Sequence, residues 1–252
     1  MEQQIIVLGM HRSGTSMLSK LLINLGVDMG DGNHVGSISN VDGHNEDTEM
    51  RVINEAILST LKSTWDDPPK KEDIAHIEDF ICKQYTEFVD KRGGLWGVKD
   101  PRLSLFASEL DKVLTNPKYI FILRNEDSVA KSLNVRDGMS IDKAKKLKCK
   151  YDEYIVDFLS NKSHLKIQYE DLIDSPTQVL FSICKFLEIK VRKEAISHIR
   201  NQTDLEELKK QKLYLSLKNA LFSVCKDPKK IFRKNTFTFI KANLRRIKEL
   251  YL

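Results

Sequence analysis

The feature that most constrains the fold is an apolar run that leads directly into a polar loop containing glycine. Residues 5–9 read IIVLG, residues 10–16 read MHRSGTS, and leucines at helical spacing follow through residue 25. A strand that turns into a helix through such a loop is typical of anion sites, because loop amides and the positive helix end face one point. The run therefore predicts a strand–loop–helix unit with an anion site. The alternative is a tight turn that needs Gly14 for its geometry alone.

Three further apolar runs, at 95–99, 119–124 and 165–169, have the character of buried parallel strands. Helical patterns lie at 14–25, 46–62, 73–91, 103–114, 126–134, 141–160 and 177–188. This alternation predicts an α/β fold, with a P-loop-type parallel sheet flanked by helices on both faces. We expect residues 1–208 to form this domain, with ligands at the carboxyl ends of the strands.

Residues 209–252 are expected to form a basic, amphipathic, helical C-terminal extension of the same domain. They hold 13 Lys and Arg against two acids, whereas the preceding 208 residues carry 28 basic and 34 acidic side chains. The extension is expected to pack on the domain with a solvated basic face. Peripheral contact with an anionic membrane surface, or attraction of an acidic glycan, are the alternatives. No nucleic-acid partner is expected, because aromatic residues do not interleave with the basic ones at a recognisable module spacing.

The cysteines and the apolar runs indicate in which cellular compartment the protein is expected. The four cysteines are scattered, without a C-x-x-C pair or a histidine at ligand spacing, which favours a reducing compartment and no metal site. The N-terminus leads straight into a strand, which leaves no room for a signal peptide. No run approaches the roughly 20 apolar residues of a membrane span. We therefore expect a cytoplasmic protein.

The loop lacks the lysine of the G-x-x-x-x-G-K-[ST] pattern. Thr15 stands at the lysine position, and the cation of the loop is Arg12. Triphosphate chemistry normally uses that lysine together with an acid that holds Mg²⁺. A sulfuryl group carries one negative charge and moves without a metal, so Arg12 alone can stabilise charge on the bridging oxygen. The loop therefore favours a phosphosulfate, and a P-loop kinase or NTPase is the alternative.

Five segments resemble a known family. GMHRSGTSML (9–18) resembles the 5′-phosphosulfate loop of sulfotransferases that use 3′-phosphoadenosine 5′-phosphosulfate (PAPS), in the form of the tyrosylprotein and bacterial branches. FILRNEDSVAKSL (121–133) resembles their 3′-phosphate motif, and WGVKDPR (96–102) is similar to a segment of bacterial sulfotransferase-like sequences. GHNEDTEMRVINEAIL (43–58) with STWDDPP (63–69) resembles a helix of the same bacterial group. YEDLIDSP (169–176) is similar to a segment that mostly builds the fold.

The resemblance implies that the co-substrate is PAPS and that the product is adenosine 3′,5′-bisphosphate (PAP). Residues that would hold the 5′-phosphate are Arg12, Ser13, Gly14, Thr15 and Ser16. Arg124 and Ser132 would hold the 3′-phosphate from two sides. A capping role for Arg124 at its turn is the alternative.

The acceptor hydroxyl needs a base, and the resemblance implies Glu46 for this role. Its alternative role is that of an acid near a helix N-terminus, and His44 and His11 are the substitute bases. Lys99 and Arg102 would stabilise the sulfuryl oxygens or hold the acceptor, and an ion pair with Asp100 is their alternative role. His11 is expected to shape the loop.

We expect an acceptor on a carbohydrate or another small molecule, with His44 and Arg102 as its contacts. A non-catalytic PAP-binding relative that acts through its basic extension is a further alternative.

Overall fold

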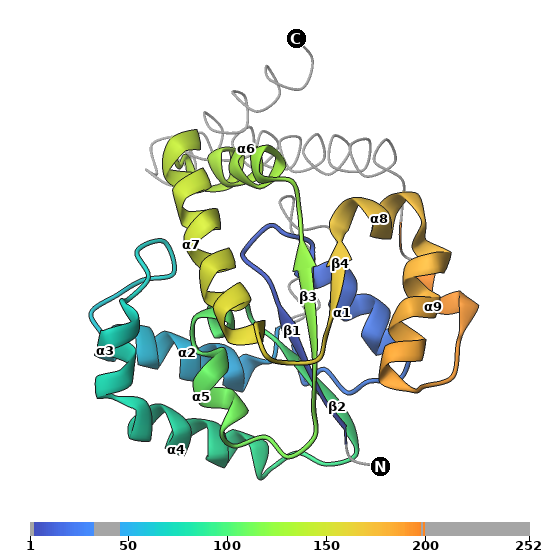
Figure 1. Ribbon diagram of the computed structural model, residues 1–252, viewed down its shortest axis with the longest axis horizontal. Coiled ribbons are helices and arrows are strands. Elements are labelled where there is room, and N and C mark those ends of the chain that lie inside the picture. The colour runs from blue at the N-terminus through green and yellow to red at the C-terminus, as the bar shows by residue number, and fades with distance from the viewer. Residues whose placement is uncertain (1–2, 33–45, 198, 200–252) are drawn as a thin grey trace, which may run out of the picture. The chain divides into compact units, whose positions relative to one another are not determined.

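The computed structural model describes residues 3–32, 46–197 and 199, which form an α/β unit around a parallel sheet (Figure 1). Its strands are β1 (Gln3–Leu8), β2 (Leu95–Lys99), β3 (Pro117–Leu123) and β4 (His164–Gln168). Their order is β2-β1-β3-β4, and every neighbouring pair is parallel. The predicted fold class is therefore confirmed, while residues 33–45 and 209–252 lie outside the described residues.

Strand β1 is buried on both faces, as its continuous apolar run predicts, whereas β4 is mostly exposed. All six residues of β1 are buried. Ile6 and Leu8 belong to the large core cluster built with α2, α4, α5 and α7, whereas Ile5 and Val7 are equally buried outside that cluster. Successive side chains of a strand point to opposite faces, so the second pair faces a separate layer. Figure 1 shows α1 and α9 on that side.

The helices are bounded as follows. They are α1 (Thr15–Asn24), α2 (Thr48–Thr60), α3 (Lys71–His76), α4 (Glu78–Val89), α5 (Ala107–Asp111), α6 (Glu126–Asp137), α7 (Ile141–Leu159), α8 (Tyr169–Asp174) and α9 (Pro176–Leu187). Short 3₁₀ helices η1 (Pro101–Leu105) and η2 (Lys193–Ile196) complete the described elements.

Two predicted helices and one predicted strand differ from the observed elements. The pattern at 73–91 is divided at Ile77 into α3 and α4, and the pattern at 103–114 is a 3₁₀ turn followed by α5. The run at 165–169 stops as a strand at Gln168, because Tyr169 already opens α8.

In the parallel sheet the carboxyl ends of all four strands lie at one edge. β1 leads into the polar loop, β2 ends at Lys99, β3 ends just before Arg124, and β4 ends just before Tyr169. In parallel sheets this carboxyl edge is where ligands bind. The candidate site residues are therefore expected together here.

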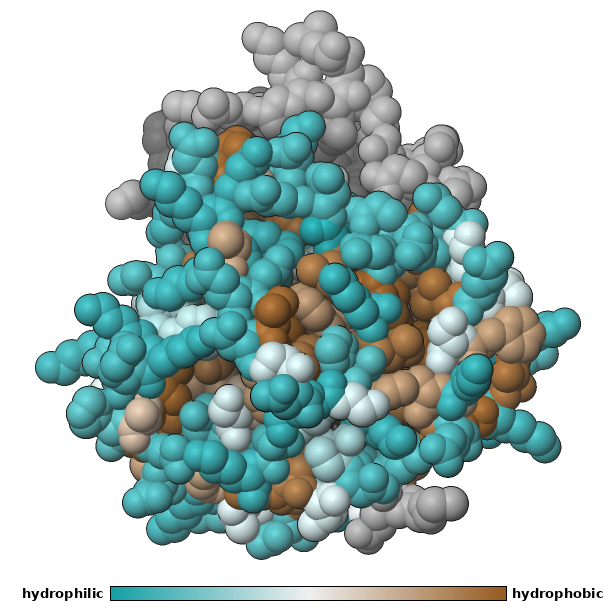
Figure 2. Space-filling view, viewed as in Figure 1, coloured by the Kyte–Doolittle hydropathy of each residue, from teal (hydrophilic) through white to brown (hydrophobic). Residues whose placement is uncertain are grey.

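The surface in view is mostly hydrophilic, with apolar side chains between polar ones (Figure 2). The exposed large apolar residues are Val52, Phe80, Val135, Ile141, Val156, Phe181 and Val191. Within the described part of the chain, no helix combines the length and the apolar character needed to cross a membrane.

Candidate active site

The loop between β1 and α1 has a backbone that restricts its sequence. Gly14 has φ 94°, and a Cβ there would lie 2.2 Å from Cδ2 of Tyr169. Arg12 also has a positive φ, 71°, which is uncommon outside glycine and occurs often at functional loops. The glycine is therefore needed both for its conformation and for the close approach of Tyr169.

Polar groups of the loop point into the protein. The hydroxyl of Ser13 and Nε2 of His11 are buried, and neither has a hydrogen-bond partner among the described residues. Thr15 is buried as well and begins α1, whose first amides lack intrahelical partners. Orphaned buried donors beside a helix N-terminus fit an anion such as a phosphate.

The predicted 3′-phosphate residues lie against this loop. Nε of Arg12 donates to Oγ of Ser132 at 2.9 Å, and Nη1 of Arg124 donates to the carbonyl oxygen of Arg12 at 3.0 Å. The Arg124 guanidinium lies over the Tyr169 ring at 4.2 Å, and its buried Nε has no partner among the described residues. Segments more than 100 residues apart in the sequence thus form one cluster.

This cluster holds more positive than negative charge. Burial, and then the neighbouring Arg136 and Arg124, lower the pKa of Arg12 to about 10. Asp137 opposes this shift but is bound to Arg136, with an N–O distance of 2.7 Å. Grouped arginines of this kind are stabilised by a bound anion, because an anion offsets their mutual repulsion.

Glu46 meets a cation at the end of β2. Nζ of Lys99 is 2.9 Å from Oε1 of Glu46, and it also donates to Oγ of Ser16 at 3.4 Å. The Lys99 side chain is 1 % exposed and that of Glu46 is 11 % exposed. Burial lowers the pKa of Lys99, while Glu46 opposes the shift. The pair therefore joins the predicted base to the first turn of α1.

Arg102 forms the ion pair with Asp100 that is its alternative role, and it also lies near Glu46. Its Nη1 donates to Oδ1 of Asp100 at 2.9 Å, which is the ion pair foreseen as the alternative. The same nitrogen lies 4.0 Å from Oε2 of Glu46, and Nη2 donates to Glu55 at 3.3 Å. Arg102 therefore borders the Glu46–Lys99 pair while it is held by two other acids.

The start of α2 fixes the backbone next to Glu46. Asp47 is the N-cap, and its side chain accepts a hydrogen bond from the backbone N–H of Met50. Nη2 of Arg92 is 2.6 Å from the other oxygen of Asp47. Glu46 thus precedes the cap rather than standing in the first helical turn, because Asp47 occupies the capping position.

His11 lies in an aromatic wall that the sequence did not reveal. Its ring is 4.6 Å from that of Trp65 and 6.4 Å from that of Tyr151, and the Arg136 guanidinium lies 5.1 Å from the Trp65 ring. Burial, followed by Arg102 and Arg136, lowers the pKa of His11 well below its ordinary value. A neutral His11 that shapes the loop agrees with the prediction.

Three contributors were missed as site residues. Trp65 and Tyr169 lie in segments that the sequence assigns to a helix region and to the fold, and Arg136 lies just beyond the helix predicted at 126–134. For Arg136 a signal existed, because it follows Ser132 by four residues and therefore shares its helix face. His44, predicted as an acceptor contact, lies outside the described residues.

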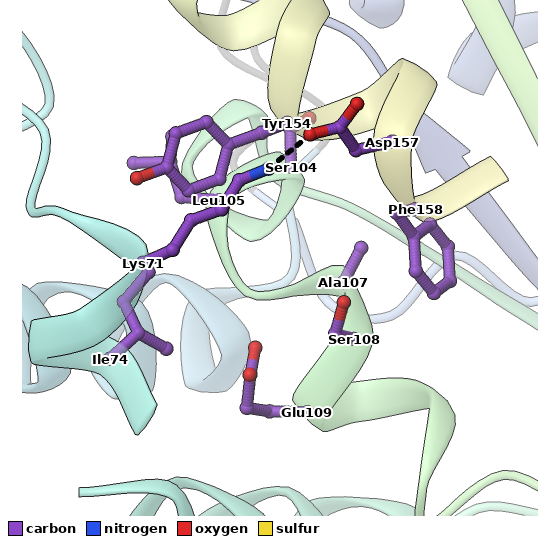
Figure 3. A pocket seen from close by; sticks show the side chains of 10 residues that line it. All are labelled: Lys71, Ile74, Ser104, Leu105, Ala107, Ser108, Glu109, Tyr154, Asp157 and Phe158. Carbon is purple, nitrogen blue, oxygen red and sulfur yellow. Dashed lines mark hydrogen bonds and ion pairs between the residues drawn. The ribbon is translucent and has the colours of Figure 1, made fainter. Parts of the chain in front are cut away.

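A cavity of about 240 Å³ lies elsewhere in the described residues (Figure 3). It is lined by Lys71, Ile74, Ser104, Leu105, Ala107, Ser108, Glu109, Tyr154, Asp157 and Phe158. Of these residues, Ser104 is joined to the start of the loop, because its Oγ accepts a hydrogen bond from the Gly9 amide. The clustered charges therefore identify the candidate site better than the cavity does. Across the described ranges, no three His, Cys, Asp or Glu side chains group closely enough to hold a metal ion.

Comparisons with known proteins agree with this geometry. A putative protein-tyrosine sulfotransferase from Caenorhabditis briggsae is 22% identical over 216 residues, which cover 78% of this chain and 69% of the relative. Among solved structures, the sulfotransferase domain from the curacin biosynthetic pathway is similar in fold, with a TM-score of 0.52, 20% identity and 77% of each chain covered. The profile of the sulfotransferase family matches residues 4–193, and the chain therefore belongs to the sulfotransferase family.

Proposed function

We propose that this chain transfers the sulfuryl group of PAPS to an acceptor hydroxyl and releases PAP. The observation that carries the proposal is the cluster in which Arg12, Arg124 and Ser132 meet at the loop. A phosphate beside the loop and a second phosphate beside Arg124 would offset the mutual repulsion of these cations. Membership of the sulfotransferase family supports this donor.

The 5′-phosphate would be held by the loop. Gly14 lets the backbone close around the anion, and Ser13, Thr15 and Ser16 supply hydroxyls around the N-terminus of α1. The 3′-phosphate would be held by Arg124 and Ser132. Because Arg12 donates to Ser132, we assign Arg12 to this phosphate as well as to the loop.

Transfer would proceed by attack of the acceptor oxygen on sulfur. The bond between sulfur and the bridging oxygen breaks, a new S–O bond forms, and the acceptor proton passes to Glu46. Lys99, buried beside Glu46 and Ser16, would stabilise negative charge on the bridging oxygen of the leaving phosphate. Arg102 would face the sulfuryl oxygens or the acceptor from the same side.

The proposed acceptor group is a carbohydrate hydroxyl or a phenol. The name of the relative from Caenorhabditis briggsae favours a tyrosine, so both classes belong in an acceptor screen. His44 and the basic residues 209–252 are proposed contacts for an acidic acceptor, and the latter also for a membrane surface.

The decisive experiment compares nucleotides by calorimetry. PAP is expected to bind more tightly than AMP or ATP with Mg²⁺, and Arg124→Ala is expected to weaken PAP about tenfold to hundredfold. Arg51→Ala, on the exposed surface of α2, is the matched control and should leave PAP affinity unchanged. Equal or tighter binding of Mg²⁺–ATP would refute the proposal in favour of a kinase or NTPase.

The non-catalytic alternative makes a different prediction. Such a relative would bind PAP but would not consume PAPS, and Glu46→Gln would leave its cellular role intact. Release of PAP from PAPS that is lost in Glu46→Gln would exclude it.

A further inference from the structure

A chain of buried polar side chains runs from the core to the proposed transfer site. Tyr85, Asn54 and Asp100 are each completely buried. Oη of Tyr85 donates to Oδ1 of Asn54 at 2.7 Å, and Nδ2 of Asn54 donates to Oδ2 of Asp100 at 3.2 Å. Three elements, α4, α2 and the end of β2, contribute one residue each.

The outer end of this chain is Arg102. Oδ1 of Asp100 accepts both the backbone N–H and Nη1 of Arg102, each at 2.9 Å. Nη1 of Arg102 also lies 4.0 Å from Glu46, and Asp100 is the next residue after Lys99. Oδ2 of Asp100 thus accepts from Asn54 and also from Nη1 of Arg102, at 3.1 Å, so the carboxylate joins Asn54 to the cation that borders the proposed base.

The hydroxyl of Tyr85 sets the orientation of the Asn54 side-chain amide in this row of hydrogen bonds. A carboxylate only accepts hydrogen bonds, so Asp100 requires the NH₂ group of Asn54. The Tyr85 hydroxyl donates to the amide oxygen and thereby turns the NH₂ group toward Asp100. Leucine would fill a similar volume in this apolar region, so packing alone gives no reason for a polar side chain here.

We propose that Asn54 is a positioning residue, which holds the Asp100 carboxylate ionised and oriented so that it fixes Arg102 beside Glu46. This inference rests on the proposed function, because Glu46 and Lys99 are its reacting pair. Asn54 itself is buried behind Asp100 and is assigned no contact with substrate.

The electrostatic surroundings agree with this role. Burial raises the pKa of Asp100 and the charge of Glu46 adds to the shift, whereas Arg102 and the hydrogen bond from Asn54 lower it. The titratable and charged groups that face Asp100 are Arg102, Glu46, Lys99, Tyr85 and Tyr151. Loss of the Asn54 hydrogen bond should therefore raise the Asp100 pKa and weaken the hold on Arg102 at low pH.

The test uses three variants of the full chain. Asn54→Leu removes the donor, and Tyr85→Phe removes only the group that orients it. Tyr119→Phe is the matched control, because it removes one phenol hydroxyl bound to one carboxylate, that of Asp111, away from the loop. The Asp100 pKa is followed by carboxyl ¹³C NMR, which needs no catalytic activity. The rate of sulfuryl transfer from PAPS to water, giving sulfate and PAP, is measured against pH in single turnovers.

We expect Asn54→Leu to raise the Asp100 pKa by about one unit, the equivalent of one hydrogen bond to a charged group. The acid limb of the rate profile should move to higher pH by the same amount. Tyr85→Phe should give a smaller shift in the same direction, and Tyr119→Phe none.

Two results would overturn the inference. One is an Asp100 pKa that stays unchanged in Tyr85→Phe and in Asn54→Leu, or that moves equally in Tyr119→Phe. The other is a raised Asp100 pKa without movement of the acid limb, which would leave Asn54 a purely structural role. Failure of the proposed function is distinguishable, because the wild type itself would then neither prefer PAP nor release it from PAPS.

Discussion

The buried pair of Glu46 and Lys99 allows a quantitative test by a double-mutant cycle. Removing one member of a buried ion pair typically costs about 3–5 kcal/mol, because the remaining charge is left without its partner. Glu46→Gln and Lys99→Met should each lower the free energy of unfolding by an amount of this order, since their side chains are 11 % and 1 % exposed. The double variant removes both charges and should be closer to the wild type than either single variant.

The measurement is urea unfolding followed by circular dichroism at pH 7 and at about pH 9.5. Glu46 opposes the effect of burial on Lys99, so Glu46→Gln should lower the Lys99 pKa further. A lysine whose folded pKa lies below its unfolded value destabilises the protein at low pH, and stability is regained as pH rises through the folded pKa. The loss in Glu46→Gln should therefore shrink at the higher pH.

Asp157→Asn is the control, because it breaks the exposed pair with Lys71, where the expected cost is about 0–1 kcal/mol. The reasoning fails if the costs of Glu46→Gln and Lys99→Met are additive in the double variant. It also fails if Glu46→Gln is no more costly than Asp157→Asn.

Two further perturbations address the loop. Gly14→Ala should cost at least about 2 kcal/mol of stability, because its positive φ disfavours a side chain and the Cβ meets Tyr169. Gly93→Ala, where an added Cβ meets nothing within 4 Å, should change unfolding in urea little. The depressed pKa of His11 predicts that stability is lost as pH falls below its unfolded value of about 6.5. Acid titrations should show a shallower loss for His11→Gln, and an identical slope would contradict this prediction.

The inner strands β1, β2 and β3 were predictable because they contain apolar runs that are mostly buried. The strand–loop–helix unit at Gly14 and the convergence of Lys99 and Arg124 at one edge follow from the same pattern. α8 was not predictable from periodicity, because it has only six residues and begins at the strand-like Tyr169. The break at Ile77 carries neither glycine nor proline, so the pattern alone gave no reason to divide the helix there.

The contacts between side chains were harder to predict from the sequence than the fold was. The Arg12–Ser132 hydrogen bond joins residues 120 positions apart, and no local pattern encodes such a pair. The ion pair of Lys99 with Glu46 likewise joins residues 53 positions apart. Tertiary packing determines which of these side chains pair, and this packing cannot be read directly from a single sequence.

The position of Lys99 explains how the loop can lack a lysine. β1 and β2 are parallel neighbours in which Val7 is paired with Lys99, so the end of β2 lies beside the start of the loop. The ammonium of Lys99 consequently reaches Ser16 in the first turn of α1, although it belongs to another strand.

A lysine within the loop would move with the backbone that holds the phosphate. A lysine on β2 is fixed by the sheet and is paired with Glu46, so the cation and the proposed base lie together. This arrangement suits a reaction in which charge on a bridging oxygen and a proton on the acceptor must be handled together. Arg12 is then available for the cluster with Ser132 and Arg124, where a second phosphate would be recognised.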